Sequence, residues 1–317
     1  MQLVFIISQP RSGSTLLQRL LSNTSVVSTT PESWLLLPFL GFLKSGLNTC
    51  AYNSDLALSA VQEFINNGIG QPSFRDRLAH FIEDVYQDSS SIDSKYFIDK
   101  TPRYYEVVDL IYEFFPTAKI ILLTRSPIEV VSSMRSTWNI KSPFDLYPYR
   151  RDILKAPLLI EEFRLSAEGS GRVYTQTYES MVENPKKVVG EIYAWLGLQE
   201  DLVNVDIVRH TAVFGKFGDP HSKEKDMLNS RPLRQHSWEK ETRPWQDFYR
   251  GYAHYLNSKT GLEYELFGLK LRKTNTFDDY LDFCELEIPD SKGFLSKNVF
   301  RSFWLKAKYQ YQKGQNN

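Results

Sequence analysis

Residues 5–21, FIISQPRSGSTLLQRLL, constrain the fold of this chain more than any other stretch. The run FII is β-branched and aromatic and suits a buried strand, and the leucines at the other end recur at helical spacing. The polar sequence QPRSGST, residues 9–15, connects the two. A strand, a tight loop and a helix in direct succession gather the loop N–H groups and the helix N-terminus at one place. We therefore predict an anion-binding loop at residues 9–15.

Five residues of this loop have the chemistry that anion binding needs. Gly13 lets the backbone approach a ligand closely, and Arg11 supplies a planar cation that suits phosphate or sulfate. Hydroxyl donors come from Ser12, Ser14 and Thr15. The loop differs from the G-x-x-x-x-G-K-[ST] loop of nucleotide hydrolases, because the first glycine is missing and the cation precedes Gly13. An ordinary strand-to-helix turn with polar capping residues is the alternative interpretation.

The composition fits one large or two small α/β domains. The chain has 317 residues, 42% of them apolar, and its 38 basic residues balance 38 acidic ones. A net charge of zero does not suggest a nucleic-acid partner. The two cysteines cannot form a disulfide framework, no Cys/His cluster has metal-ligand spacing, and no apolar run reaches the roughly 18 residues of a membrane helix. We expect a cytoplasmic protein without a metal, a nucleic-acid partner or a membrane span.

Strands separated by helices predict a parallel sheet covered on both faces. We expect strands near residues 5–7, 25–28, 96–98, 119–123 and 172–176. Helices are expected over residues 16–21, 74–86, 107–115, 128–134, 185–196 and 246–257, with a loop over 66–72. The pattern weakens after about residue 271. We predict a main domain over residues 1–270 and an extension over residues 271–317 that packs on this domain or is partly flexible.

A second pair of polar residues follows the most apolar predicted strand, KIILL. Arg125 stands at the C-terminal end of this strand, and Ser133 comes eight residues later, two turns into the next helix. Such a pair can hold one phosphate from two sides. Taken alone, a surface arginine and a serine bonded to its own main chain would be the simpler interpretation.

These features, in this order, resemble the sulfotransferase family that uses 3′-phosphoadenosine 5′-phosphosulfate (PAPS). QPRSGSTLLQRLL is similar to the 5′-phosphosulfate loop of its tyrosylprotein and carbohydrate branches, and ILLTRSPIEVVSSM resembles its 3′-phosphate motif, with Arg125 and Ser133 in the defining positions. YTQTYESMVENPKKVVGEIYAWLGL is similar to a later family segment, and FIDKTPRYY resembles a stretch of carbohydrate and related bacterial members. The resemblance covers about residues 3–269.

The resemblance implies a P-loop-kinase-like α/β fold, a three-layer sandwich with a central parallel sheet. It also implies in-line transfer of a sulfuryl group from PAPS to an acceptor hydroxyl on a carbohydrate, a glycolipid or a small-molecule alcohol. The product would be 3′-phosphoadenosine 5′-phosphate (PAP), and no metal would be required. The cofactor-binding residues expected from the resemblance are Arg11, Ser12, Gly13, Ser14, Thr15, Arg125, Ser133 and Tyr178.

The expected catalytic residues are Arg11, Glu32 and Lys100. Arg11 would stabilise charge on the departing phosphate. The acceptor must also lose a proton to a base. Cytosolic members use a histidine before the arginine of the 3′-phosphate motif, but here His80 comes too early and Arg103 lies near the expected position.

The tyrosylprotein and heparan members use a glutamate after the loop, and Glu32 matches it. An acidic residue at a helix start is the alternative interpretation of Glu32. We expect Lys100 to orient the sulfuryl group or the acceptor. A solvated lysine paired with Asp99 is the alternative.

Two other functions stay open at this point. A nucleotide kinase or NTPase on the same fold is disfavoured by the absent Gly-Lys-[ST] sequence and by the lack of a clear acidic magnesium ligand after a strand. A non-catalytic PAPS-binding protein is disfavoured by the presence of both Arg11 and Glu32.

The sequence does not identify the acceptor or the oligomeric state. Acceptor pockets are expected from the variable loops 34–72, 136–170 and 205–245. Trp34 and Trp138 are candidates for lining the acceptor cleft. Lys223 and Arg231 are candidates for contacts with the 3′-phosphate or the acceptor, and the sequence does not decide between these roles.

Overall fold

The computed structural model describes residues 1–47, 53–205, 238–262, 266 and 274–285. These residues form two compact units, which we describe separately. The first comprises Met1–Arg125 and Leu159–Arg234, and the second Ser126–Leu158 and Gln235–Asn317. The expected domain over residues 1–270 stays a prediction.

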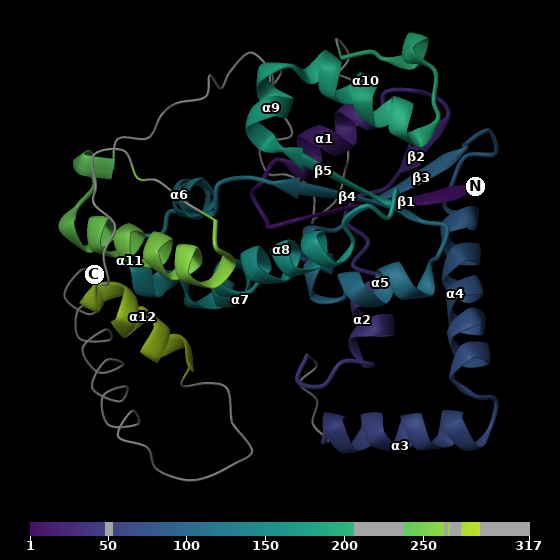
Figure 1. Ribbon diagram of the computed structural model, residues 1–317, viewed down its shortest axis with the longest axis horizontal. Helices are drawn as coiled ribbons and strands as arrows, with labels where there is room; N and C mark the ends of the chain where they lie inside the picture. The colour runs from purple at the N-terminus through teal and green to yellow at the C-terminus, as the bar shows by residue number, and fades with distance from the viewer. Residues whose placement is uncertain (48–52, 206–237, 263–265, 267–273, 286–317) are drawn as a thin grey trace. The chain divides into compact units, whose positions relative to one another are not determined.

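A five-stranded parallel sheet forms the centre of the first unit (Figure 1). Its strands are β1 (Gln2–Ser8), β2 (Val27–Thr29), β3 (Tyr96–Lys100), β4 (Lys119–Thr124) and β5 (Val173–Thr177). Their order in the sheet is β2-β3-β1-β4-β5, and every neighbouring pair is parallel. The predicted α/β class with a central parallel sheet is confirmed. Each predicted strand is present, although β2 begins two residues later than expected.

Helices cover both faces of this sheet, which gives the predicted three layers (Figure 1). One face carries α1 (Ser14–Leu21), α9 (Tyr178–Glu183) and α10 (Pro185–Leu196). The other face carries α2 (Leu36–Gly41), α4 (Gln71–Asp88), the short η1 (Pro102–Glu106) and α5 (Val108–Phe114). The unit also contains α3 (Ser54–Asn67) and η3 (Glu200–Leu202), and α8 (Ala156–Ser166) begins just before its second part.

The loop between α3 and α4 is shorter than predicted. α3 ends at Asn67 and α4 begins at Gln71, so only three of the residues expected as loop, 68–70, connect them. Gly70 adopts a φ of 77°, and Pro72 occupies the first turn of α4, where its missing N–H has no cost. The sequence NNGIGQP therefore ends one helix and starts the next within a single turn.

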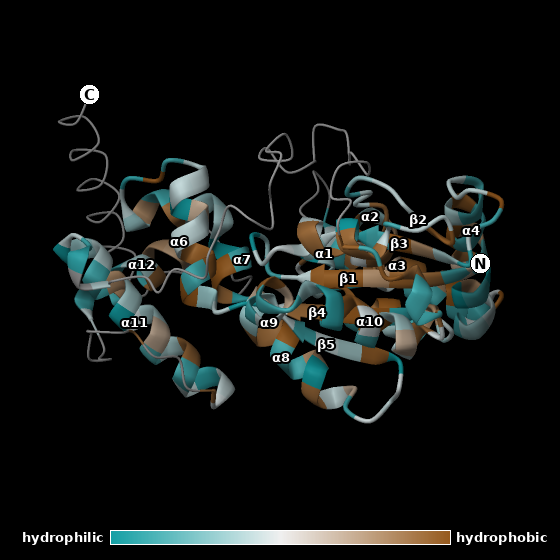
Figure 2. Ribbon diagram, turned by 90° about the horizontal axis from the view of Figure 1, so that it is seen from above, coloured by the Kyte–Doolittle hydropathy of each residue, from teal (hydrophilic) through white to brown (hydrophobic). Residues whose placement is uncertain are grey.

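Successive side chains of β1 point to opposite faces of the sheet, and both faces are covered by helices, so the strand is buried on both sides. Val4 and Ile6 pack in one apolar cluster with residues of α1 and α10. Phe5 points to the other face, where its ring centroid lies 6.2 Å from that of Tyr86 and 5.7 Å from that of Phe115. Figure 2 shows the hydrophobic character of β1 and β4 at the centre of the sheet.

The second unit is helical and has an apolar core of its own. Its elements are α6 (Pro127–Thr137), η2 (Pro143–Tyr149), α7 (Arg150–Leu154), η4 (Trp238–Lys240), α11 (Arg243–Thr260) and α12 (Asn275–Glu285). The fully buried rings of Phe248 and Tyr252 on α11 pack against Phe277 on α12. Helix α12 lies within the segment 271–317 that we expected as an extension, and it packs against α11.

Replacing Phe5 by alanine tests the core of the first unit. Phe5 is fully buried, so the change leaves a cavity, and we expect the free energy of unfolding to fall by about 3–5 kcal/mol. The matched control is Phe64→Ala on α3, where the ring is 79% exposed; we expect a change within about 0.5 kcal/mol. Urea denaturation measures both values. Equal losses for the two variants would contradict this assignment of the core.

Candidate active site

The carboxyl ends of all five strands bring polar side chains to one edge of the sheet in the first unit. The loop 9–13 follows β1, and Glu32 follows β2 after a short link. Lys100 is the last residue of β3, Arg125 follows β4, and Tyr178 follows β5. β1 lies between β3 and β4, so the loop occupies the middle of this edge, where the strand order changes direction. Such a position is where ligands bind in open parallel sheets.

The loop after β1 has the backbone conformation of a tight anion-binding turn. Arg11 and Gly13 both adopt positive φ angles, 74° and 90°. The N–H of Ser12 donates to the carbonyl of Gln9 at 3.2 Å, which closes the loop. The carbonyl of Gly13 accepts from the N–H groups of residues 16 and 17, at 3.0 and 3.1 Å, and starts α1. The N–H groups of the first helical turn precede these bonds and have no acceptor within the helix.

Tyr178 and Arg125 pack around this loop. A Cβ atom added at Gly13 would lie 2.5 Å from Cδ2 of the Tyr178 ring, so the ring rests directly on the glycine. The guanidinium carbon of Arg125 lies 4.3 Å from the centroid of the same ring, a cation–π contact. Nη1 of Arg125 also donates to the carbonyl oxygen of Arg11 at 3.1 Å. The structure therefore brings Arg125, Tyr178 and the loop together.

Two serine hydroxyls beneath the loop fit an anionic ligand. The hydroxyl oxygens of Ser8 and Ser12 are fully buried, and neither has a hydrogen-bond partner within the described part of the chain. A buried hydroxyl without a partner costs free energy, because it has lost its bonds to water. The oxygen atoms of a bound sulfate or phosphate group would supply acceptors for such hydroxyls.

An ion pair joins the residues expected to act on the acceptor. Nζ of Lys100 lies 2.7 Å from Oε1 of Glu32, and the Lys100 side chain is only 1% exposed. Nε1 of Trp34 donates to Oε2 of the same carboxylate at 3.1 Å. The alternative of a solvated Lys100 paired with Asp99 is wrong, because this lysine is buried and its pair is Glu32. The alternative of a helix-starting Glu32 is also wrong, because α2 begins only at Leu36.

Lys100 and Asp99 are neighbours in a strand and so point to opposite faces, and the register of the sheet shows which face each one takes. Lys100 pairs with Ile6 of β1, and Asp99 pairs with Phe5. Paired residues of parallel neighbours have side chains on the same face. Lys100 therefore extends to the face covered by α1, and Asp99 extends to the face of Phe5, where α4 and η1 lie.

Asp99 is the centre of a buried hydrogen-bond cluster that the sequence did not reveal. Its Oδ2 accepts from Ser33 and Tyr86 at 2.6 Å and from Tyr104 at 2.9 Å, and its Oδ1 accepts from Thr101 at 2.9 Å. Burial raises the pKa of the Asp99 carboxyl, and the four hydroxyl donors oppose this shift. Burial also raises the pKa of Tyr86 and of Tyr104, so both phenols stay protonated and donate. In the sequence, this cluster is indicated by a carboxylate that directly follows the apolar residues of the strand YFIDK.

The remaining predicted residues are distributed differently. Ser133 lies on α6 in the second unit, and its role stays a prediction. Trp138 also belongs to the second unit, where its ring stacks on Tyr149 at 4.2 Å between centroids. Lys223 and Arg231 lie outside the described residues.

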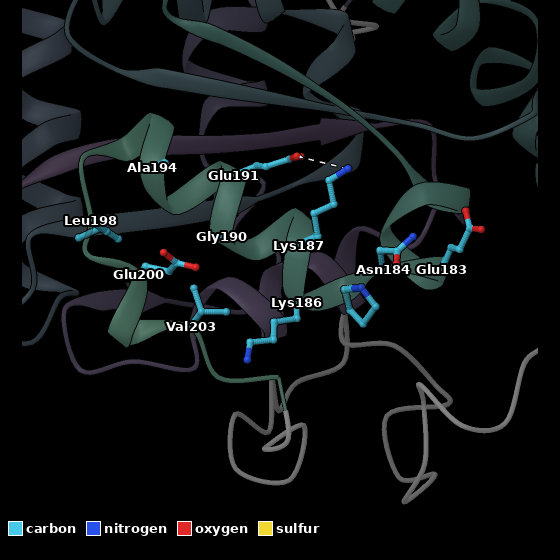
Figure 3. A pocket seen from close by; sticks show the side chains of 11 residues that line it. Glu183, Asn184, Lys186, Lys187, Gly190, Glu191, Ala194, Leu198, Glu200 and Val203 are labelled. Atoms are coloured by element: carbon cyan, nitrogen blue, oxygen red, sulfur yellow. Dashed lines mark ion pairs between the residues drawn. The ribbon is translucent and has the colours of Figure 1, made fainter.

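A surface groove on the first unit shares none of these residues. It has a volume of about 750 Å³ and runs along α10, with charged groups of both signs at its rim (Figure 3). Its lining includes Lys186, Lys187 and Glu191, and the last two form an ion pair at 3.9 Å.

Among the described residues, no three His, Cys, Asp or Glu side chains are grouped so that they could hold a metal ion. No described helix is long and apolar enough to cross a membrane.

Comparison with known proteins decides the family. A sequence model of the Sulfotransferase family matches residues 3–201. The chain belongs to the sulfotransferase family. The matched region of this sulfotransferase runs from β1 to η3 and includes the loop, Glu32, Lys100, Arg125 and Tyr178.

Two curated relatives illustrate the similarity. The nodulation protein NoeE of Sinorhizobium fredii is 27% identical over 254 residues, which cover 72% of this chain and 58% of that protein. Protein-tyrosine sulfotransferase 1 of Danio rerio is 25% identical over 231 residues, 69% of this chain and 58% of that protein. The sulfotransferase chain thus spans less than two thirds of the length of either relative.

Two solved structures of sulfotransferases align with much of this chain. The enzyme from Alicyclobacillus acidocaldarius aligns with 83% of this chain and 97% of its own, at 15% identity and a TM-score of 0.47. The sulfotransferase domain of the Synechococcus PCC 7002 olefin synthase aligns with 74% of this chain and 89% of its own, at 24% identity and a TM-score of 0.45.

Replacing Gly13 by alanine tests the contact between the loop and Tyr178. A left-handed φ costs alanine about 1–2 kcal/mol, and the overlap with the ring adds about 1–3 kcal/mol. Gly46→Ala is the matched control, because Gly46 has a φ of 71° and its added Cβ would meet nothing within 4 Å. We expect Gly13→Ala to lower the free energy of unfolding more than Gly46→Ala in urea titrations. Equal losses would show that the ring moves aside without cost.

Proposed function

We propose that this sulfotransferase transfers a sulfuryl group from PAPS to a hydroxyl group of an acceptor. The observation that best supports the proposal is the arrangement around the loop 9–13 in the first unit. Arg125 and Tyr178 contact this loop, and the same edge of the sheet carries the Lys100–Glu32 ion pair. An anion site beside a paired base and cation is what sulfuryl transfer to a hydroxyl needs.

The donor site would be formed by the loop and by Arg125. PAPS, as the donor substrate, supplies a sulfuryl group on the oxygen that links sulfur to its 5′-phosphate. The N–H groups and hydroxyls of residues 12–15 would bind the 5′-phosphosulfate, and Arg11 would stabilise charge on the departing phosphate. Arg125, together with Ser133, would bind the 3′-phosphate. The loop would therefore bind the phosphosulfate end of PAPS, and Arg125 would bind its 3′-phosphate.

The acceptor side would depend on Glu32. Its carboxylate already accepts from Lys100 and Trp34, and these bonds fix its orientation. A carboxylate has about four lone-pair sites, so two contacts leave room for the proton of an acceptor hydroxyl. Glu32 would take this proton as the hydroxyl oxygen attacks sulfur. Lys100 would stabilise negative charge on the sulfuryl oxygens.

The acceptor and the cellular setting belong to the same proposal. Carbohydrate, glycolipid and small-molecule alcohols are the proposed acceptors, and a cytoplasmic location is the proposed setting. The relatives' names, a nodulation protein and a protein-tyrosine sulfotransferase, do not select one class. Transfer of label from ³⁵S-PAPS into fractions of a cell extract, with the product identified by mass, tests the proposal. Magnesium-dependent ATP turnover, or PAPS binding without any transfer, would overturn it.

Arg125→Ala tests the assignment to the 3′-phosphate. Losing a charge-assisted contact should weaken PAP binding by about 1.5–3 kcal/mol, or roughly 10- to 150-fold in Kd. Binding of adenosine 5′-phosphosulfate, which lacks the 3′-phosphate, should be unchanged. Arg77→Ala on α4, an exposed arginine, controls for the altered net charge. Calorimetric titration measures all affinities. Equal weakening for both ligands would mean that Arg125 acts through the Arg11 carbonyl instead.

Glu32→Gln and Arg11→Ala test the catalytic assignments. We expect both to stop measurable transfer from ³⁵S-PAPS, since loss of a general base alone costs about 10²–10⁴-fold in rate. Glu32→Gln should keep the affinity for PAP, because Glu32 faces the acceptor and the amide retains its shape. Normal turnover by Glu32→Gln would show that another group is the base.

A further inference from the structure

Two bonds between side chains join the segment after β2 to the end of β3, beside a longer bond from the Trp34 N–H to the Thr101 hydroxyl at 3.4 Å. The first is the Glu32–Lys100 ion pair, at 2.7 Å. The second is the hydrogen bond from the Ser33 hydroxyl to Oδ2 of Asp99, at 2.6 Å. Ser33 is the neighbour of Glu32, and Asp99 is the neighbour of Lys100. The second bond therefore sets the distance between the same two pieces of main chain that the ion pair spans.

One side of this second bond is firmly fixed. Asp99 lies in β3, whose Cα atoms pair with β1, and its side chain is 1% exposed. Tyr86, Thr101 and Tyr104 also donate to its carboxylate. The position of Asp99, and with it that of Lys100, is thus set by the sheet and by three further hydrogen bonds.

The other side depends on side chains. β2 ends at Thr29, so the segment that carries Glu32 and Ser33 has left the sheet. Ser33 donates to Asp99, accepts from the N–H of Leu35 at 3.1 Å, and its oxygen lies 3.0 Å from the hydroxyl of Tyr104. One hydroxyl therefore links the segment to β3 and closes its turn. Trp34 lies between Ser33 and Leu35 and has a φ of 54°. This backbone conformation is unfavourable for a large side chain and has to be stabilised by its surroundings.

We propose that Ser33 and Asp99 are positioning residues, which hold Glu32 against Lys100 so that the carboxylate faces the acceptor before the acceptor binds. In this proposal, neither side chain acts on the reacting atoms itself. This inference rests on the proposed function, in which Glu32 is the base. The buried cluster of hydroxyls around Asp99 would then help to orient the base for the reaction, in addition to stabilising the fold.

The chain offers a matched pair of variants. Ser33→Ala and Tyr86→Phe each remove one hydroxyl donor from the same oxygen, Oδ2 of Asp99, and both bonds measure 2.6 Å. Tyr86 comes from α4 and does not hold the segment of Glu32, so the Ser33–Asp99 bond survives in Tyr86→Phe. Ser33→Thr keeps a hydroxyl on the segment and serves as the rescue variant.

The activity test uses ³⁵S-PAPS and the extract fraction that the wild-type protein sulfates. A displacement of the base by about 1 Å costs on the order of 10²-fold in rate, so we expect Ser33→Ala to lower kcat by about 10- to 100-fold. The KM for PAPS and the Kd for PAP should stay at wild-type values. Tyr86→Phe should keep kcat, although both variants lower the melting temperature, and Ser33→Thr should restore most of the rate.

A crystal structure of each variant gives a readout without an acceptor. We expect the Lys100 Nζ to Glu32 Oε1 distance to exceed 4 Å in Ser33→Ala and to stay near 2.7 Å in Tyr86→Phe. An intact ion pair in Ser33→Ala, or equal loss of kcat in Ser33→Ala and Tyr86→Phe, would overturn the inference. Glu32→Gln separates the proposed base from the proposed positioning role. Normal turnover by Glu32→Gln would show that Glu32 is not the base. An inactive Glu32→Gln together with a normal Ser33→Ala would show that only the positioning role is wrong.

Discussion

The parallel pairing of β1 with both β3 and β4 is the constraint on which the site depends. β1 pairs with β3 through residues 2–6 and with β4 through residues 4–8. Its neighbours therefore deliver Lys100 on one side and Arg125 on the other, with the loop 9–13 between them. Parallel strands need crossovers of a dozen or more residues, so these side chains come from distant parts of the sequence. This strand order therefore places a lysine and an arginine on the two sides of the loop.

The cations at this edge are stabilised in two different ways. Lys100 is almost fully buried, and a buried ammonium group is costly unless a carboxylate and further hydrogen bonds compensate for its lost water. Glu32 supplies that compensation. Arg125 instead packs on the ring of Tyr178 and donates to a backbone carbonyl, an arrangement that suits a planar, weakly hydrated guanidinium group. Lys100 thus forms an ion pair with Glu32, and Arg125 donates a hydrogen bond to the loop.

The hydroxyl cluster around Asp99 shows how a polar group is accommodated in the core. Asp99 is adjacent to the fully buried Phe97 and Ile98 in β3, and an unbonded carboxylate there would cost several kcal/mol. Four hydroxyl donors from three parts of the chain offset part of this cost. Such a network is stable only when all of its members are bonded, so it specifies one arrangement of its surroundings. The segment of Glu32 is part of those surroundings through Ser33.

The sequence by itself determined the local elements and the anion loop. The run FII, the glycine of the loop and the leucines of α1 lie within 17 consecutive residues, and their spacing is enough to predict strand, turn and helix. The position of Arg125 at the end of a predicted strand made it a candidate, and family resemblance added Glu32 and Lys100. Only the tertiary structure decided which of them meet. Lys100 and Asp99 are adjacent in sequence and both charged, and the alternation of side chains within β3 sends them to opposite faces. Their register against Ile6 and Phe5 decides which face each one takes, Lys100 the face of α1 and Asp99 the face of α4. That register is a property of the assembled sheet, because it depends on how β3 pairs with a strand from a distant part of the sequence.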